Sequence, residues 1–160
     1  MARHNPIRYI MEAPLPSKTY QRRLQYRPSY KDINYAYNKL NFYLFDNRLR
    51  KPYIEQGTRR QTWGYCQWED ELQDTGSYCH IKLMDKWFCP QWFWNTLAHE
   101  MVHQWQWDIG RFEGYRVDTS SGSHGRSFFL WRDRFAHYGL SLKTAHGMKR
   151  WLKHQTFSKC

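Results

Sequence analysis

The feature that most constrains this chain is a segment near its middle, residues 97–103, which reads LAHEMVH. It places His99 and His103 four residues apart, with Glu100 directly after the first histidine. A helix brings side chains at this spacing onto one face, where both imidazoles can reach one cation and the carboxylate lies beside it. The segment therefore predicts a helix that carries a metal site. The alternative is an exposed histidine pair on an ordinary helix.

A catalytic zinc ion takes three protein ligands and keeps one open position, so a third ligand must follow in the sequence. The metzincin pattern fails, because Gln106 stands at its glycine position and Ile109 at its histidine position. A later glutamate also fails, since Glu113 is the last one in the chain and precedes any further helix. His124, which lies in the small-residue run SGSHG, and Asp118 remain. The residues alone leave both candidates open.

Aromatic residues must supply most of the core, because the 160 residues include 9 Trp, 12 Tyr and 9 Phe and the mean hydropathy is −0.94. We expect most of these rings to fill the core of one domain rather than to form a stacking surface. No apolar run is long enough to span a membrane, and residues 1–6 lack the apolar stretch of a secretory signal. The four cysteines form no CxxC pair, and we expect Cys66 and Cys79 to be free thiols. A soluble, cytoplasmic protein is therefore expected.

The pattern of apolar and turn-forming residues predicts an α+β fold with a small, mainly antiparallel sheet. The last two strands are expected to pair with each other, and Gly139 is expected to close the last helix. The predicted elements are a helix over 29–47, strands over 52–55, 62–69 and 76–84, a helix over 90–107 and a helix over 126–138.

The net charge of +11 is concentrated at the two ends of the chain. Residues 1–27 and 143–160 each carry +5, whereas residues 28–142 carry +1. Two basic ends on a nearly neutral body favour contact with a polyanion, with nucleic acid as the first candidate and solvated tails as the alternative. The candidate nucleic-acid contacts are Arg22, Arg23, Lys149, Arg150 and Lys153.

The segments LAHEMVHQWQ (97–106) and GSHGRSF (122–128) together resemble the SprT-like metalloproteases, which include the Spartan-type repair proteases. The segments LNFYLFDNRLRKPYIE (40–55) and TWGYCQW (62–68) are similar to the opening helix and the strands of that family. The resemblance covers about residues 30–138. Pro6, Pro14 and Pro16, with no sustained periodicity around them, indicate an extended or mobile basic arm over 1–27. The resemblance implies a metalloprotease domain over 28–142, followed by a basic segment over 143–160 without the zinc ribbon of many members.

The resemblance also implies a zincin-like minimal metalloprotease fold and an activity. Zn²⁺ would be held by His99, His103 and His124, while Glu100 would act as the general base of peptide hydrolysis. The implied substrate is a protein bound or crosslinked to DNA, and the implied partner is DNA with single-stranded or junction regions. Compact members of the family occur in phages, and a phage origin would fit this chain.

Two further expectations concern how the substrate is handled. It would add as a strand along an exposed sheet edge, for which residues 76–83 are the candidate. An oxyanion donor would come from one of Tyr115, Arg126, His137 and Tyr138. The main rival function is a non-catalytic one, in which zinc stabilises a nucleic-acid-binding or virion-associated protein.

Overall fold

The computed structural model of the chain describes residues 5–14, 26–58, 62–69, 75–117 and 123–144. It is a mixed α+β structure with a small three-stranded sheet. In chain order the elements are α1 (Pro6–Glu12), α3 (Tyr30–Phe45), β1 (Tyr53–Gly57), β2 (Gly64–Trp68), β3 (Cys79–Met84), α4 (Pro90–Asp108), the 3₁₀ helix η1 (Gly110–Glu113), α5 (Arg126–Phe129) and α6 (Arg132–His137).

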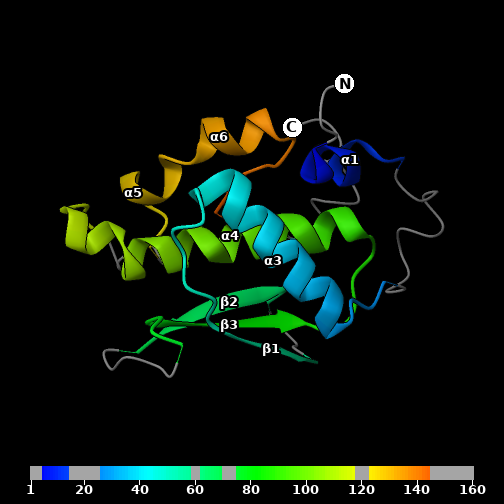
Figure 1. Ribbon diagram of the computed structural model, residues 1–160, viewed down its shortest axis with the longest axis horizontal. Coiled ribbons are helices and arrows are strands. Elements are labelled where there is room, and N and C mark those ends of the chain that lie inside the picture. Colours follow the sequence, from blue (N-terminus) through cyan, green and yellow to red (C-terminus); the bar gives the residue numbers. More distant parts are fainter. Residues whose placement is uncertain (1–4, 15–25, 59–61, 70–74, 118–122, 145–160) are drawn as a thin grey trace.

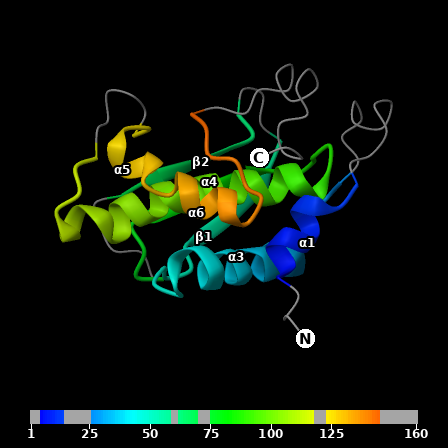
Figure 2. The ribbon, with the colours of Figure 1, turned by 90° about the horizontal axis from the view of Figure 1, so that it is seen from above.

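Helix α4 is the central element of the fold. Figures 1 and 2 show α3 and α4 side by side over one face of the sheet, with α5 and α6 on the far side of α4. Pro90 occupies the first turn, where its missing N–H costs nothing, and every residue from Gln91 to Gln106 is buried. In the part of the chain that the structure describes, no helix is both long enough and apolar enough to cross a membrane.

The sheet has the order β1-β3-β2. Strands β2 and β3 are antiparallel, as predicted, but β1 pairs with β3 in parallel, so the expectation of a mainly antiparallel sheet is wrong. The parallel pairing joins two strands that are separated in the sequence by β2. Local sequence patterns predict pairing only between consecutive strands joined by a short turn, so they could not predict this one. Strand β3 is therefore central, and the proposed substrate edge over residues 76–83 is also wrong. The sheet edge next to α4 belongs to β2.

Helix α3 follows the predicted pattern closely. Ser29 accepts a hydrogen bond from the backbone N–H of Asp32, whose carboxylate accepts one from the backbone of Ser29 in return. Its apolar side chains recur at helical spacing and are buried against α4. The helix ends at Asp46, which adopts a left-handed conformation with φ 55°.

Aromatic rings fill the core, as the composition predicted. Trp87, Trp92 and Phe93 are fully buried, and Trp63 packs on the first two of them. The prediction of free thiols is wrong for Cys66 and Cys79, which form a disulfide between β2 and β3. The spacing of the two cysteines could not show this, because the strand register brings them together diagonally across the antiparallel pair.

The N-terminal segment is not a mobile arm over residues 6–12, contrary to the prediction. Asn5 caps α1, and Ile7 and Met11 are buried on the face that packs against α3 and α4. Arg8 also donates a hydrogen bond to the carbonyl of His137 at 3.1 Å. A helix of two turns is too short for its periodicity to stand out, and its prolines suggested extended chain.

The predicted helix over 126–138 is divided into α5 and α6. The break lies at Leu130 and Trp131, where the backbone N–H of Trp131 bonds to the carbonyl of Phe128 three residues earlier. This tighter turn accompanies the burial of Phe128 and the packing of Trp131 on Phe45. Gly139 follows α6 with φ 79°, so the predicted end of the helix is confirmed.

Candidate metal centre

The two histidines of the HExxH segment lie in the middle of α4, on one face. Their side chains are not an exposed pair, because His99 is 7% and His103 is 5% exposed. Burial of imidazoles in a core without compensating partners is unfavourable, so their surroundings must satisfy them. The ordinary alternative, two solvated histidines, does not fit this environment.

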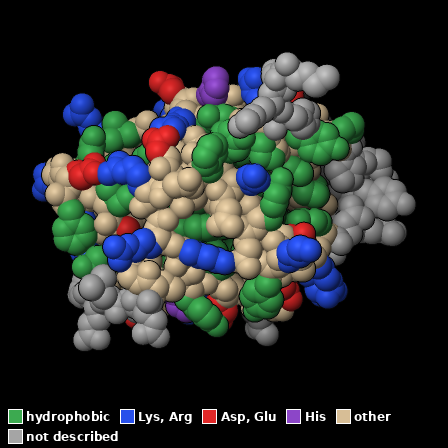
Figure 3. Space-filling view, in the orientation of Figure 1, with side chains coloured by type: hydrophobic (Ala, Val, Ile, Leu, Met, Phe, Trp, Pro, Cys, Tyr) green, Lys and Arg blue, Asp and Glu red, His purple; other side chains and the backbone are tan. Residues whose placement is uncertain are grey.

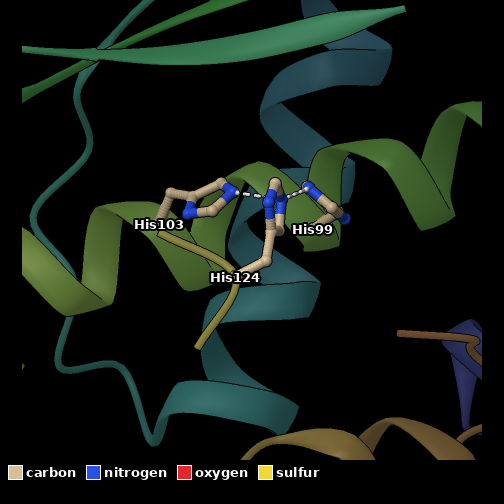
Figure 4. Close-up of side chains that lie close together, drawn as sticks. All are labelled: His99, His103 and His124. Atoms are coloured by element: carbon tan, nitrogen blue, oxygen red, sulfur yellow. Dashed lines mark hydrogen bonds between the residues drawn. The ribbon is translucent and has the colours of Figure 1, made fainter. Parts of the chain in front are cut away.

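His124 reaches the same place from the loop before α5. Figure 4 shows its ring pointing between the other two, with Nε2 3.1 Å from Nε2 of His103 and 3.2 Å from Nε2 of His99. One nitrogen from each of the three rings lies within 4.8 Å of the others. Ser123, just before His124, has φ 65°, in the left-handed region that residues other than glycine rarely adopt. Among the residues that the structure describes, this is the group suited to holding a metal ion.

The spacing of these nitrogens fits a tetrahedral metal ion. With Zn–N bonds of about 2.0–2.1 Å, ligand nitrogens lie about 3.3 Å apart, close to the separations of His124 from His103 and His99. Three imidazoles without a carboxylate or thiolate ligand are a known donor set for a catalytic zinc that keeps an open position. The three histidines therefore fit the metal that the sequence implied.

Phe128 backs the three imidazoles from α5. Its fully buried ring lies 4.9 Å from the ring of His99 and 4.8 Å from those of His103 and His124. A rigid apolar surface of this kind restricts the tilt of each imidazole and keeps water from one side of the site. Phe128 therefore packs against all three imidazoles at once.

Glu100 lies beside the histidines and under strand β2. Its carboxyl group accepts a hydrogen bond from the backbone N–H of Cys66, and only 4% of the residue is exposed. Burial raises the pKa of Glu100 to about 8, although the bond from Cys66 opposes the shift. A cation held by the neighbouring imidazoles would favour the charged carboxylate. The site thus combines three imidazole nitrogen donors with one acid–base group.

His103 is held in the form that a metal requires. Burial lowers its pKa to about 4, with a smaller contribution from His124, while the hydrogen bond to Gln106 acts in the other direction. The ring is therefore neutral at pH 7, as coordination demands. Its Nδ1 lies 2.8 Å from Oε1 of Gln106, a partner that sequence reasoning missed. The one signal was a glutamine a single turn after a ligand on the same helix.

Trp68 and Trp107 form one side of the site. The two indoles stack with centroids 4.6 Å apart, and Trp68 meets the ring of His103 edge-on at 6.2 Å. Arg111 also packs on Trp107, with its guanidinium carbon 4.7 Å from the ring centroid. Most rings were expected to fill the core, but these two are only partly buried, and Trp68 borders the metal centre through His103.

Several predicted site residues lie outside the described part of the chain. They include Asp118, the rival for the third ligand, and all the candidate nucleic-acid contacts, Arg22, Arg23, Lys149, Arg150 and Lys153. Of the candidate oxyanion donors, Tyr115 packs on Trp105 and Tyr138 on Tyr43, so both rings are engaged by side chains outside the histidine cluster. The choice among the four stays open.

A model of the SprT-like family matches residues 33–146, which is most of the chain. The chain belongs to the SprT-like family. Among curated proteins, none matches the sequence. Membership indicates a metalloprotease-type function at the level of the family, and the family is associated with zinc. The matched region contains the three histidines and Glu100 and begins within α3.

Proposed function

We propose that this SprT-like protein is a zinc-dependent endopeptidase that cleaves proteins associated with or crosslinked to DNA. His99, His103 and His124 would hold Zn²⁺, and Glu100 would be the general base. The convergence of three imidazole nitrogens beside a buried carboxyl group is the observation that carries the proposal. A zinc ion at this point supplies Lewis acidity, which polarises a carbonyl group and acidifies water.

Glu100 would move the protons of the reaction. It lies one residue from His99 on α4, and its carboxylate would accept a proton from the attacking water and deliver it to the leaving amine. The partial burial of the site limits competing water and strengthens the electrostatic interactions within it. The bond from the backbone N–H of Cys66 restrains the carboxyl group beside the histidines.

Strand β2 offers the backbone along which an extended substrate would bind. Trp63 and Glu69 form ladder hydrogen bonds with Met84 and Tyr78 of the β3 side, so the alternating residues between them direct their backbone groups away from β3. Gly64, Cys66 and Trp68 are these residues. An extended peptide could pair with the outward-facing groups of Gly64 and Trp68 and pass the histidines of α4, while the N–H of Cys66 stays bonded to Glu100.

The charge distribution supports DNA as a partner. Residues 28–142 carry +1, so nearly all of the net charge of +11 belongs to the two ends of the chain. On the face seen in Figure 3, Lys and Arg side chains are scattered among hydrophobic and acidic ones rather than joined in one patch.

The decisive experiment incubates wild type and Glu100→Gln with a DNA-bound protein, with and without single-stranded DNA, and follows cleavage on a gel. Both proteins should retain zinc, while the substitution should lower the cleavage rate by about 10²–10⁴-fold. Cleavage independent of DNA would keep the peptidase and remove the DNA-associated substrate. If neither protein cuts and both bind zinc and DNA, the rival function as a zinc-stabilised binding protein is correct.

A further inference from the structure

Gln106 is a fully buried polar residue that contacts both parts of the metal centre. It lies on α4 one turn after His103, and none of its surface is exposed. Its Oε1 is 2.8 Å from Nδ1 of His103, and its Nε2 is 2.9 Å from both the carbonyl oxygen of Ser123 and Oγ of Ser127. The amide thus joins α4 to the loop and helix on either side of His124.

These contacts fix which way the amide of Gln106 points. The carbonyl of Ser123 can only accept a hydrogen bond, so the nitrogen of the amide must face it and the oxygen must face His103. Nδ1 of His103 therefore carries the proton. In a neutral imidazole the other nitrogen then holds a lone pair, and Nε2 is the atom directed at the three-histidine cluster. Gln106 selects the tautomer of His103 that can bind a metal.

The nitrogen of Gln106 also holds the segment that carries His124. Ser123 comes directly before His124 and has the left-handed φ of 65°, a conformation that a serine adopts only when its surroundings hold it there. Ser127, on the other side of His124, lies in the first turn of α5 and is itself buried. The two bonds from Nε2 go to the backbone carbonyl of Ser123 and to the side-chain hydroxyl of Ser127. They therefore hold the chain on both sides of the third histidine, which is 21 residues from His103.

Another buried amide on the same helix offers a comparison. Gln104 is also fully buried and equally well bonded, but its partners are Tyr37, the carbonyl of Arg50 and Asp108. These contacts tie α4 to α3 and to the segment before β1, on a part of the helix that faces away from the histidines. Gln104 thus shares the structural role of a buried amide without a contact to the metal centre.

We propose that Gln106 is a positioning residue that couples two of the three metal ligands: its oxygen sets the tautomer of His103 and its nitrogen holds the loop of His124. The inference rests on the metal site of the proposed function. It does not require that the protein cleave proteins.

The test compares Gln106→Met with the matched control Gln104→Met. Zinc affinity is measured by competition with a chromophoric chelator, and the fold of each metal-free variant by circular dichroism and thermal unfolding. Loss of a hydrogen-bond partner of a metal ligand weakens metal binding by about 10–100-fold, and we expect this for Gln106→Met. Gln104→Met should lower the unfolding temperature at least as much, yet keep the zinc affinity of the wild type.

Two milder substitutions separate the two contacts. Gln106→Glu keeps an acceptor for His103 but cannot donate to the carbonyl of Ser123, and Ser127→Ala removes one bond to the loop. In ¹⁵N NMR of the metal-free protein, His103 should carry its proton on Nδ1 in the wild type, Gln106→Glu and Ser127→Ala, and lose this preference in Gln106→Met. Both milder variants should bind zinc more weakly than the wild type, through His124.

The outcomes separate this inference from the proposed function. If Gln106→Met binds zinc as tightly as the wild type, or if Gln104→Met loses as much affinity, Gln106 is only a packing residue and the inference is wrong. An unchanged His103 tautomer in Gln106→Met also overturns it. A wild type that binds zinc and shows the expected differences but cleaves no protein would leave the inference standing and overturn the proposed function. A wild type that binds no zinc would overturn both.

Discussion

The burial of Glu100 lowers the stability of the metal-free protein at pH values where the carboxyl group would ionise in water. Its carboxyl group has a pKa of about 8 in the folded chain against an ordinary value of 4.5, because burial disfavours the charged form. The folded state therefore binds a proton more tightly than the unfolded state. As the pH rises from about 4.5 to 8 the metal-free protein should lose stability, since the unfolded chain releases this proton first.

The substitution Glu100→Gln removes this pH-dependent cost. We expect metal-free Glu100→Gln to be more stable than metal-free wild type at pH 8, on the order of 2 kcal/mol, and the gain to shrink toward pH 5. Thermal unfolding at several pH values, with a chelator present, measures the difference. If wild type and Glu100→Gln unfold at the same temperature at pH 8 as well as at pH 5, the carboxyl group is solvated in the metal-free protein.

The third ligand can be decided at the level of single residues. We expect His124→Ala to weaken zinc binding by more than about 100-fold, because it removes a direct ligand rather than a supporting contact. Asp118→Ala should keep one equivalent of zinc. Metal content after gel filtration, measured by atomic emission, distinguishes the two variants. Full zinc content and full activity in His124→Ala would show that the geometry of Figure 4 is not the functional one.

At the scale of elements, strand β2 approaches β3 and α4 so closely at Gly64 that an added Cβ would crowd its neighbours. A Cβ at Gly64 would lie 3.1 Å from Cδ2 of Leu83, 3.2 Å from the carbonyl oxygen of Lys82 and 3.3 Å from Cγ2 of Thr96. Gly64→Ala should therefore destabilise the protein by about 1–3 kcal/mol and lower peptidase activity by displacing β2. Gly57→Ala in β1 is the control, since no atom lies within 4 Å of its added Cβ. Denaturant unfolding should leave that control close to wild type.

Helix α1 makes a second prediction at this scale. Ile7 is fully buried against the body, so Ile7→Ala should cost about 2–4 kcal/mol of the free energy of unfolding. Glu12→Ala, on the exposed side of the same helix, should change it by less than about 0.5 kcal/mol. Urea unfolding of both variants tests whether α1 is docked. If Ile7→Ala is as stable as the wild type, α1 is not docked and the prediction of a mobile N-terminal arm stands.

At the scale of the whole molecule, the two basic ends predict binding to DNA that depends steeply on salt. Removing one Lys or Arg that neutralises a phosphate should reduce the slope of log K against log salt by about 0.7 for a single strand. We expect this reduction for each of the candidate contacts that is neutralised, namely Arg22, Arg23, Lys149, Arg150 and Lys153. A control variant that neutralises Lys31, Arg116 and Arg132, which are exposed on the body, should keep most of the slope. Fluorescence anisotropy over a range of salt concentrations measures both, and salt-independent binding would contradict the prediction.

Much of the fold followed from local patterns. The long helices α3 and α4 were predicted within two residues, because caps and periodicity are properties of neighbouring residues. The antiparallel pairing of β2 with β3 and the turn at Gly139 were predicted for the same reason. The parallel pairing of β1, the docking of α1 and the Cys66–Cys79 disulfide were missed, because each depends on contacts between distant segments.

The sequence by itself determined that a helix carries His99, Glu100 and His103 on a usable face, since a spacing of four residues has this meaning wherever the helix lies. It also pointed to His124, but it left Asp118 open because loop length says nothing about where a loop ends in space. Only the tertiary structure brought His124 within 3.2 Å of both other histidines. It alone placed Gln106 between His103 and the loop, because a buried amide finds its partners only when separate segments pack together.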